Sequence, residues 1–148
     1  MTTNQRHTIL IVDDEVVSRM KLGRLLGQDY HTVTAASGAE ALEILRSQDV
    51  SLIIADQRMP GMTGVDLLRQ THERSPDIIC MLMSAVDDVN MFVDAIAKCG
   101  AVRVITKPWD SAKLLDDIRI SIERYDNLIA TRRSIGRLKE KKDFERAG

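Results

Sequence analysis

Short runs of apolar residues alternate along the chain with segments whose apolar residues recur at helical spacing. Residues 8–12, 52–55 and 78–83 are apolar almost throughout and are bounded by polar residues. Runs of this length and β-branched content are typical of parallel strands that are buried on both faces of a sheet. Together with residues 30–35, which alternate, and residues 102–105, the pattern predicts five strands.

The segments between the predicted strands carry helical patterns. Helices are predicted over residues 16–26, 39–46 and 64–73, and Ser37 with Glu40 forms a capping-box pattern before the second of them. Two more helices are indicated by apolar residues at helical spacing: Val89, Phe92, Val93 and Ile96 in the fourth, and Leu114, Leu115, Ile118, Ile122 and Tyr125 in the fifth.

Five strands alternating with five helices predict an α/β fold. Crossovers between parallel strands are right-handed, which leaves a doubly wound sheet as the natural topology. The length of 148 residues is that of one domain with a short appendage. Sheets of this kind bind their ligands at the carboxyl ends of the strands, so the residues there are the first candidates for function.

Composition narrows the classes of function. The net charge of −1 favours neither nucleic-acid nor membrane binding, and an aromatic fraction of 3% is too low for a base-stacking surface. Cys80 and Cys99 have no metal-ligand or disulfide-framework spacing, so a reducing cytoplasm with both thiols free is expected. Residues 1–7 are polar and the first apolar run is too short for a signal peptide or a membrane span, so no membrane association is expected.

Four of the five predicted strands end in a residue that can do chemistry. The first strand ends at Asp13 and Asp14, the third at Asp56, the fourth at Ser84 and the fifth at Lys107. Each has an ordinary alternative, because acidic residues and serines cap helices and a loop lysine can simply be solvated. Since the carboxyl ends of parallel strands share one edge, four such coincidences favour a single site.

The residue types indicate the chemistry of this site. Three neighbouring carboxylates repel one another unless a cation joins them, and a few oxygen ligands completed by water suit Mg²⁺. An anion held beside Mg²⁺, a lysine and a hydroxyl is best matched by a phosphoryl group. A carboxylate can accept such a group as an aspartyl phosphate.

The same residues stand in motifs that resemble the receiver domain of two-component response regulators. The resemblance covers about residues 7–126 and keeps the order and spacing of every motif. It implies a cytoplasmic phosphorelay protein with a flavodoxin-like (βα)5 fold and the strand order 2-1-3-4-5. The motifs are Val12-Asp13-Asp14-Glu15, Asp56-x-x-Met59-Pro60-Gly61-Met62-x-Gly64, Ser84-Ala85 and Lys107-Pro108.

The resemblance implies a role for each residue in phosphoryl transfer. Asp56 would accept a phosphoryl group from the phosphohistidine of a sensor histidine kinase or phosphotransfer protein. Ser84 and Lys107 would contact the phosphoryl oxygens, and the peptide bond between Lys107 and Pro108 would be cis, which X–Pro bonds tolerate. The domain would then switch a downstream partner or output domain, and would be no enzyme beyond promoting its own phosphorylation and dephosphorylation.

The resemblance also implies a set of metal ligands. Asp13, Asp14, Asp56 and the backbone carbonyl of Arg58 would bind Mg²⁺, with Asp13 acting through water. No other cofactor is expected.

Several positions depart from the family pattern. Val104 stands three residues before Lys107, where the family usually has Tyr or Phe, so rotation of an aromatic ring cannot operate as the switch. Arg58 and Val86 occupy positions that tune the lifetime of the phosphoryl group in the family. Trp109 is interpreted either as a packing residue or as a partner contact.

The sequence lacks residues that two other classes of function require. A phosphatase of the haloacid-dehalogenase type also forms an aspartyl phosphate, but it needs an acid two residues after the nucleophile, and Arg58 follows Asp56 there. A flavin carrier needs a phosphate-binding loop after the first strand. Here that loop holds Asp13, Asp14 and Glu15, which would repel a phosphate that lacks a metal.

The remaining candidate residues are interpreted as structural. His7, His31 and His72 share no ligand spacing and are expected at the surface or in structural roles. Cys80 and two methionines of the fourth strand are expected in the core.

The apolar pattern continues past the last predicted helix. Leu128, Ile135 and Leu138 follow at spacings of seven and three, which is the a/d spacing of a coiled coil. Residues 130–148 hold seven basic and three acidic side chains, a net charge of +4. The sequence therefore predicts a receiver domain over residues 1–126 and a basic helical extension or linker over 127–148. This helix would continue to about Arg133 or beyond, with a homodimer contact as one use and direct nucleic-acid binding not expected.

Overall fold

The computed structural model describes residues 7–85, 93, 97 and 102–147. The predicted fourth helix, with Val89, Phe92 and Ile96, lies outside the described residues except for Val93 and Ala97. The elements along the chain are β1 (Thr8–Val12), α1 (Val16–Leu26), β2 (His31–Ala35), α2 (Gly38–Ser47), β3 (Leu52–Asp56), α3 (Gly64–Arg74), β4 (Ile79–Ala85), β5 (Val102–Lys107) and α5 (Ser111–Ala147).

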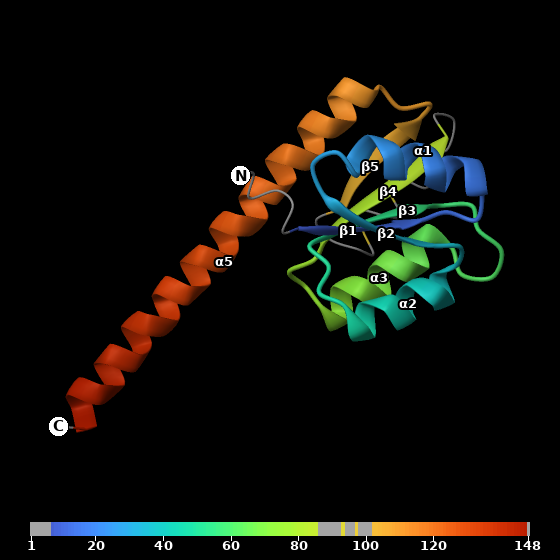
Figure 1. Cartoon of the computed structure of the whole chain (residues 1–148). Coiled ribbons are helices and arrows are strands. Elements are labelled where there is room, and N and C mark those ends of the chain that lie inside the picture. Colours follow the sequence, from blue (N-terminus) through green and yellow to red (C-terminus); the bar gives the residue numbers. More distant parts are fainter. Residues whose placement is uncertain (1–6, 86–92, 94–96, 98–101, 148) are drawn as a thin grey trace.

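The five strands form one parallel sheet in the order β2-β1-β3-β4-β5 (Figure 1), as the sequence predicted. Helices α2 and α3 cover one face, and α1 and α5 cover the other. This is the flavodoxin-like, doubly wound arrangement. Its strand order reverses between β1 and β3, whose carboxyl ends carry the candidate acids.

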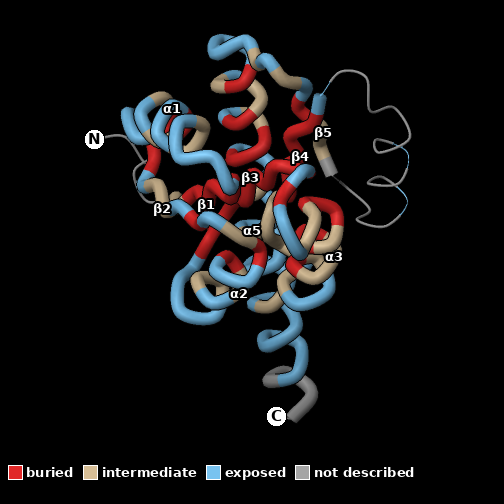
Figure 2. Tube along the Cα trace, turned by 90° about the vertical axis from the view of Figure 1, so that its right-hand side faces the viewer, coloured by how far each residue is buried: buried red, intermediate tan, exposed pale blue. Residues whose placement is uncertain are grey.

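The strands are buried on both faces, which explains their unbroken apolar sequence. Along β1, Leu10 and Val12 pack into the core cluster under α2 and α3, whereas Ile9 and Ile11 pack into the cluster under α1 and α5. The tube view shows the buried positions concentrated in the sheet (Figure 2). Cys80, Met81 and Met83 are in the core, as expected.

Side-chain caps fix where two of the helices begin. The Ser37 hydroxyl accepts the backbone N–H of Glu40, as the capping-box pattern predicted. The return contact differs by one residue, because the Glu40 carboxylate accepts the N–H of Ala36 and not that of Ser37. Thr63 caps α3 in the same way through the N–H of Asp66, a start signal that the sequence interpretation did not single out.

Helix α5 is a single helix of 37 residues that runs well past the body of the molecule (Figure 1). The predicted helical extension is confirmed and reaches Ala147. The helix continues without a break through residue 126, and a domain boundary there stays a prediction. None of the helices among the described residues combines the length and apolar character that crossing a membrane requires.

Candidate acidic site at the carboxyl edge of the sheet

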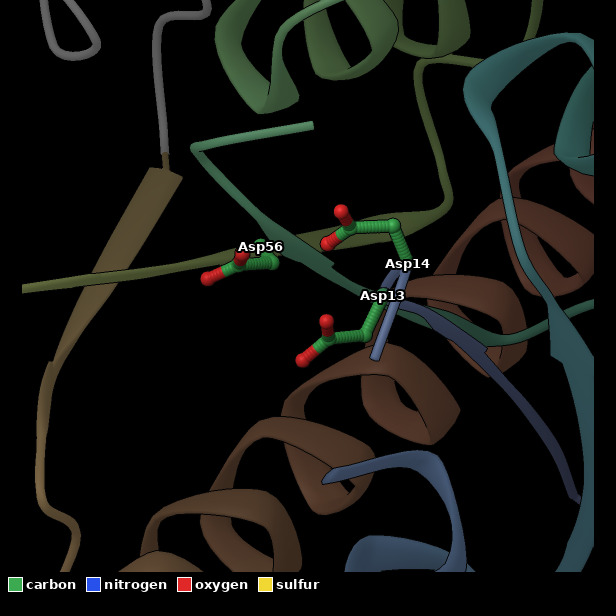
Figure 3. Close-up of side chains that lie close together, drawn as sticks. All are labelled: Asp13, Asp14 and Asp56. Atoms are coloured by element: carbon green, nitrogen blue, oxygen red, sulfur yellow. The ribbon is translucent and has the colours of Figure 1, made fainter. Parts of the chain in front are cut away.

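Three aspartates meet where β1 and β3 end. Asp13 and Asp14 directly follow β1, and Asp56 is the last residue of β3; their side chains point to the same side (Figure 3). One carboxylate oxygen from each lies within 4.8 Å of the others. Asp13 and Asp56 are only 1% and 8% exposed, whereas Asp14 is exposed. The acids that the strand-end argument predicted to meet are therefore brought together.

Local contacts hold Asp13 in place. Its Oδ1 accepts the backbone N–H of Glu15 at 3.0 Å, and its backbone carbonyl accepts a hydrogen bond from the Arg19 guanidinium at 2.7 Å. Its other oxygen, Oδ2, is buried and has no hydrogen-bond partner among the described residues. A buried anionic oxygen without a hydrogen bond is costly even with the Lys107 ammonium 3.6 Å away, so this atom leaves a position that a ligand can fill.

Among the residues that the structure describes, Lys107 brings the one ammonium group that pairs with these acids. Its Nζ lies 2.7 Å from Asp56 Oδ1 and 3.6 Å from Asp13 Oδ2. Burial alone would lower the pKa of Lys107, but the hydrogen bond to Asp56 and the charges of Asp56, Asp13 and Glu15 outweigh it, and the pKa is raised. Lys107 is thus held in its charged form. The cis peptide bond predicted between Lys107 and Pro108 is present.

Asp56 has an unfavourable environment for its charge. Burial raises the pKa of Asp56, and the neighbouring charges of Asp13 and Asp14 raise it further, although Lys107 acts in the opposite direction. One ammonium does not compensate three crowded carboxylates. The site is therefore short of positive charge.

These observations fit a hard divalent cation. The donors are carboxylate oxygens, which Mg²⁺ prefers, and the cluster is small enough for one ion to touch all three. The missing hydrogen bond at Asp13 Oδ2 among the described residues gives an independent reason to expect a cation or its water there. The residues present can hold a metal ion at the end of β1 and β3.

Two other predicted site residues lie close to Asp56: Ser84 is on the neighbouring strand, and Arg58 is in the loop that follows Asp56. Ser84 is buried in β4, one residue beyond Met83, which pairs with Asp56 across the sheet. Arg58 follows two residues after Asp56 and is exposed. The roles assigned to the Ser84 hydroxyl and the Arg58 carbonyl stay predictions. Val104 is half-buried and packs against the core cluster under α2 and α3.

Gln57 and Gly64 position the loop after Asp56, and the sequence interpretation gave neither a role. Gln57 is buried, and its Oε1 accepts the N–H of Val65 at 2.9 Å while its carbonyl accepts the N–H of Gly64 at 3.1 Å. A Cβ on Gly64 would lie 2.5 Å from the Asp56 carbonyl oxygen and 2.7 Å from Leu82. In the sequence, Gly64 itself was the signal that could have predicted this close approach to the Asp56 carbonyl.

A groove of about 870 Å³ opens beside the acidic site, between α1 and the start of α5. Lys107 lines both the groove and the site. Trp109 is half-buried and packs on the core cluster under α1 and α5, which fits the packing interpretation. The lining residues comprise an apolar part with Val17, Leu25, Pro108 and Trp109, and a basic part with Lys21, Arg24 and Lys107.

Comparison with known proteins identifies relatives over most of the chain. The family model described as the response regulator receiver domain matches residues 9–119. The hydrogenase transcriptional regulatory protein HoxA of Cupriavidus necator is 36% identical over 121 residues, which are 82% of this chain and 25% of that protein. The sporulation initiation phosphotransferase F of Bacillus subtilis is 30% identical over 118 residues, 79% of this chain and 91% of that protein.

Solved structures agree with these relatives. The signal receiver domain of an HD domain-containing protein from Pseudomonas fluorescens aligns with a TM-score of 0.81 at 30% identity, covering 88% of this chain and 96% of that one. This chain spans about a quarter of the length of the HoxA protein and nearly all of the Bacillus phosphotransferase.

Proposed function

The chain belongs to the family of response regulator receiver domains, and on that premise we propose that Asp56 is its phosphoacceptor in a Mg²⁺-dependent reaction. As a receiver domain it takes part in phosphorelay signalling. The observation that carries the proposal is the crowding of Asp13, Asp14 and Asp56 around the single Lys107 ammonium.

In the proposed reaction, a carboxylate oxygen of Asp56 attacks the phosphorus of a donor phosphohistidine. The O–P bond forms while the P–N bond breaks, and the electron pair stays on the imidazole nitrogen, which takes up a proton. Lys107, now 2.7 Å from Asp56, would pair with a phosphoryl oxygen, and the Ser84 hydroxyl would donate to another. Both contacts favour the charge that the transferred group carries.

Asp13, Asp14, Asp56 and the Arg58 carbonyl are the proposed holders of Mg²⁺. When bound, the ion would neutralise the carboxylates and the phosphoryl oxygens. The three carboxylates attract a cation, but without Mg²⁺ they would repel an incoming phosphate. Because both the carboxylates and the phosphoryl oxygens need this positive charge, phosphorylation of Asp56 is expected to depend on Mg²⁺.

The proposed donor is a sensor histidine kinase or a phosphotransfer protein that docks beside the site. The groove next to Lys107 and the exposed apolar side chains of Val16, Val17 and Met20 on α1 support such a contact. The domain would act as a signalling switch with no turnover beyond its own phosphorylation and dephosphorylation. Phosphorylation would switch a downstream output domain or partner protein.

The alternative as a haloacid-dehalogenase phosphatase receives no support from these features. That chemistry needs a carboxylic acid two residues after the nucleophile, and the exposed Arg58 stands there. The family model that matches the chain is that of response regulator receiver domains.

Intact-mass spectrometry with a small phosphodonor such as acetyl phosphate tests the proposal. The wild-type chain should gain one phosphoryl group in Mg²⁺ and none in EDTA, and Asp56→Asn should gain none. Asp49→Asn, which removes an exposed carboxylate just before β3, is the matched control and should label like the wild type. Labelling of Asp56→Asn to the wild-type extent would assign the acceptor to another residue.

A further inference from the structure

The extended part of α5 carries an apolar ridge made of Leu128, Ile135 and Leu138. These side chains are 41%, 50% and 63% exposed, an unusual exposure for three large aliphatic residues that share one helix. Leu128 and Ile135 lie within about 20° of each other around the helix axis, and Lys142 continues the same seven-residue spacing. Thr131 lies between Leu128 and Ile135 on this face, so the ridge is a narrow apolar strip with one polar break.

Contacts with the body fix the orientation of α5 where the ridge begins. Tyr125 contacts the ring of His7 edge to face, Asp126 pairs with His7 Nε2 at 3.1 Å, and Arg132 pairs with Asp77. Leu128 lies between Tyr125 and Arg132 on the same face of the helix, at spacings of three and four, whereas Leu138 lies about a third of a turn from both. Beyond these contacts α5 runs past the body of the molecule (Figure 1), so a partner can reach the exposed side chains of Ile135 and Leu138.

The charges beside the ridge are basic. Lys139 and Lys142 are exposed and lie next to Leu138 and Ile135 on the helix surface. The acidic residue Glu140 lies on the opposite side, toward the face of Tyr125, and Glu145 follows Leu138 by seven residues, two turns beyond the end of the apolar ridge. A partner that covers the ridge must therefore accept positive charge along its border.

A second copy of the chain does not supply the negative charge that this basic border requires. If Leu128 and Ile135 take a positions of a coiled coil, the e and g positions meet across the interface and decide pairing. No combination of them, parallel or antiparallel, joins opposite charges. The e positions are Arg132, Lys139 and Arg146, and the g positions are Asn127, Ser134 and Lys141. The homodimer predicted for this segment stays a prediction that these charges disfavour.

We propose that the apolar ridge of α5, with its Lys139 and Lys142 border, docks an acidic amphipathic helix of a partner protein. Leucine-like side chains of the partner would cover Leu128, Ile135 and Leu138, and its carboxylates would pair with the two lysines. This surface lies apart from the acidic site at the carboxyl edge, so the inference goes beyond the proposed phosphoryl transfer.

A synthetic probe tests this surface on the full chain. The probe is a fluorescent peptide three heptads long, with Ile at a, Leu at d and Glu at e and g, and its matched control has Lys in place of every Glu. Fluorescence anisotropy should show binding of the Glu peptide and none of the Lys peptide. Ile135→Ser with Leu138→Ser should weaken binding about tenfold or more, which corresponds to about 1.4 kcal/mol. Because both residues are exposed, the circular dichroism melt of the domain should not change.

Two charge reversals of equal size separate specific docking from general attraction. Lys139→Glu with Lys142→Glu should weaken binding about tenfold. Arg133→Glu with Arg137→Glu changes the net charge equally on the other side of the helix, and should keep most of the affinity. The Asp56→Asn chain should bind the peptide like the wild type, so this result is independent of the phosphoryl-transfer proposal.

Four outcomes would overturn the inference. These are an absence of peptide binding, equal losses from the two charge reversals, and self-association in sedimentation that Ile135→Ser with Leu138→Ser abolishes, which would make a second copy the occupant. The fourth is binding to duplex DNA or anionic phospholipid vesicles with the same dependence on the ridge residues.

Discussion

The two edges of the β-sheet treat their charged side chains in opposite ways. At the carboxyl edge, Asp13, Asp14 and Asp56 crowd around one lysine, and a buried oxygen of Asp13 is left without a hydrogen bond among the described residues. At the amino edge, His7 has a partner on each ring nitrogen, with Ser51 Oγ at 2.9 Å from Nδ1 and Asp126 at 3.1 Å from Nε2.

This difference separates chemistry from attachment. Polar groups that already satisfy one another gain little from a ligand, whereas a cluster with too few cations gains much from one. The carboxyl edge is therefore where we expect metal and phosphoryl binding. The amino edge fastens α5, through His7 near β1 and through Arg132 with Asp77 before β4.

The largest expected effect comes from adding one methyl group at the carboxyl edge. Gly64→Ala would place a Cβ 2.5 Å from the Asp56 carbonyl oxygen, so the loop and Asp56 must move. We expect a loss of about 2 kcal/mol in the free energy of unfolding, together with slower phosphorylation. Urea unfolding and the labelling rate measure the two effects.

Gly23→Ala is the matched control, because a Cβ there meets nothing within 4 Å and the residue lies inside α1. It should gain up to about 1 kcal/mol and label normally. A Gly64→Ala chain as stable as the wild type would show that the close approach to Asp56 does not constrain the site.

A smaller loss of stability is expected from a substitution at the amino edge. His7→Ala removes the contacts to Ser51, Tyr125 and Asp126 and leaves the buried Ser51 hydroxyl without that partner. We expect a loss of about 1 to 2 kcal/mol and faster amide exchange around residues 125–132, measured by hydrogen exchange. Phosphorylation of Asp56 should be unchanged, and a matching loss of labelling would contradict the separation of the two edges.

The smallest expected effect has the opposite sign. Asp13→Asn keeps the contact to the Glu15 N–H through Oδ1 but removes one charge from the crowded cluster. In EDTA the variant should be more stable than the wild type by about 1 kcal/mol, because the repulsion among the three crowded carboxylates is reduced. Added Mg²⁺ should raise the melting temperature of the wild type clearly and that of the variant much less.

Asp49→Asn serves here too as the exposed control and should respond to Mg²⁺ like the wild type. If Asp13→Asn were destabilising in EDTA and kept its full response to Mg²⁺, Asp13 would be a structural residue and not part of a cation site.

The sequence was sufficient for most of the sheet and the acid cluster. Unbroken runs such as residues 9–12 are buried on both faces, and carboxylates placed at the ends of parallel strands meet because the fold puts those ends together. The helical pattern of α1 was correct as well, but Val16 and Val17 are exposed while Leu22 and Leu26 enter the core. Periodicity predicts a helix more surely than it predicts which apolar residues are covered.

The remaining features depend on contacts between distant residues. His7 was expected only to be structural or at the surface, and its partners Ser51 and Asp126 lie 44 and 119 residues away. Likewise, the buried Gln57 side chain that receives the Val65 N–H follows no local pattern. Helix α5 reaches Ala147, whereas the sequence predicted a helix to about Arg133 or beyond. Few apolar residues follow Tyr125, so the pattern does not indicate where the helix ends.

The most direct test of the central claim is chemical trapping of the phosphorylated residue. After incubation with Mg²⁺ and acetyl phosphate, borohydride reduces an aspartyl phosphate to homoserine, which tandem mass spectrometry locates in the chain. We expect homoserine at position 56 in Mg²⁺ and none in EDTA. Homoserine at position 13 or 14, or a phosphoryl group on a serine or histidine with Asp56 unmodified, would contradict it.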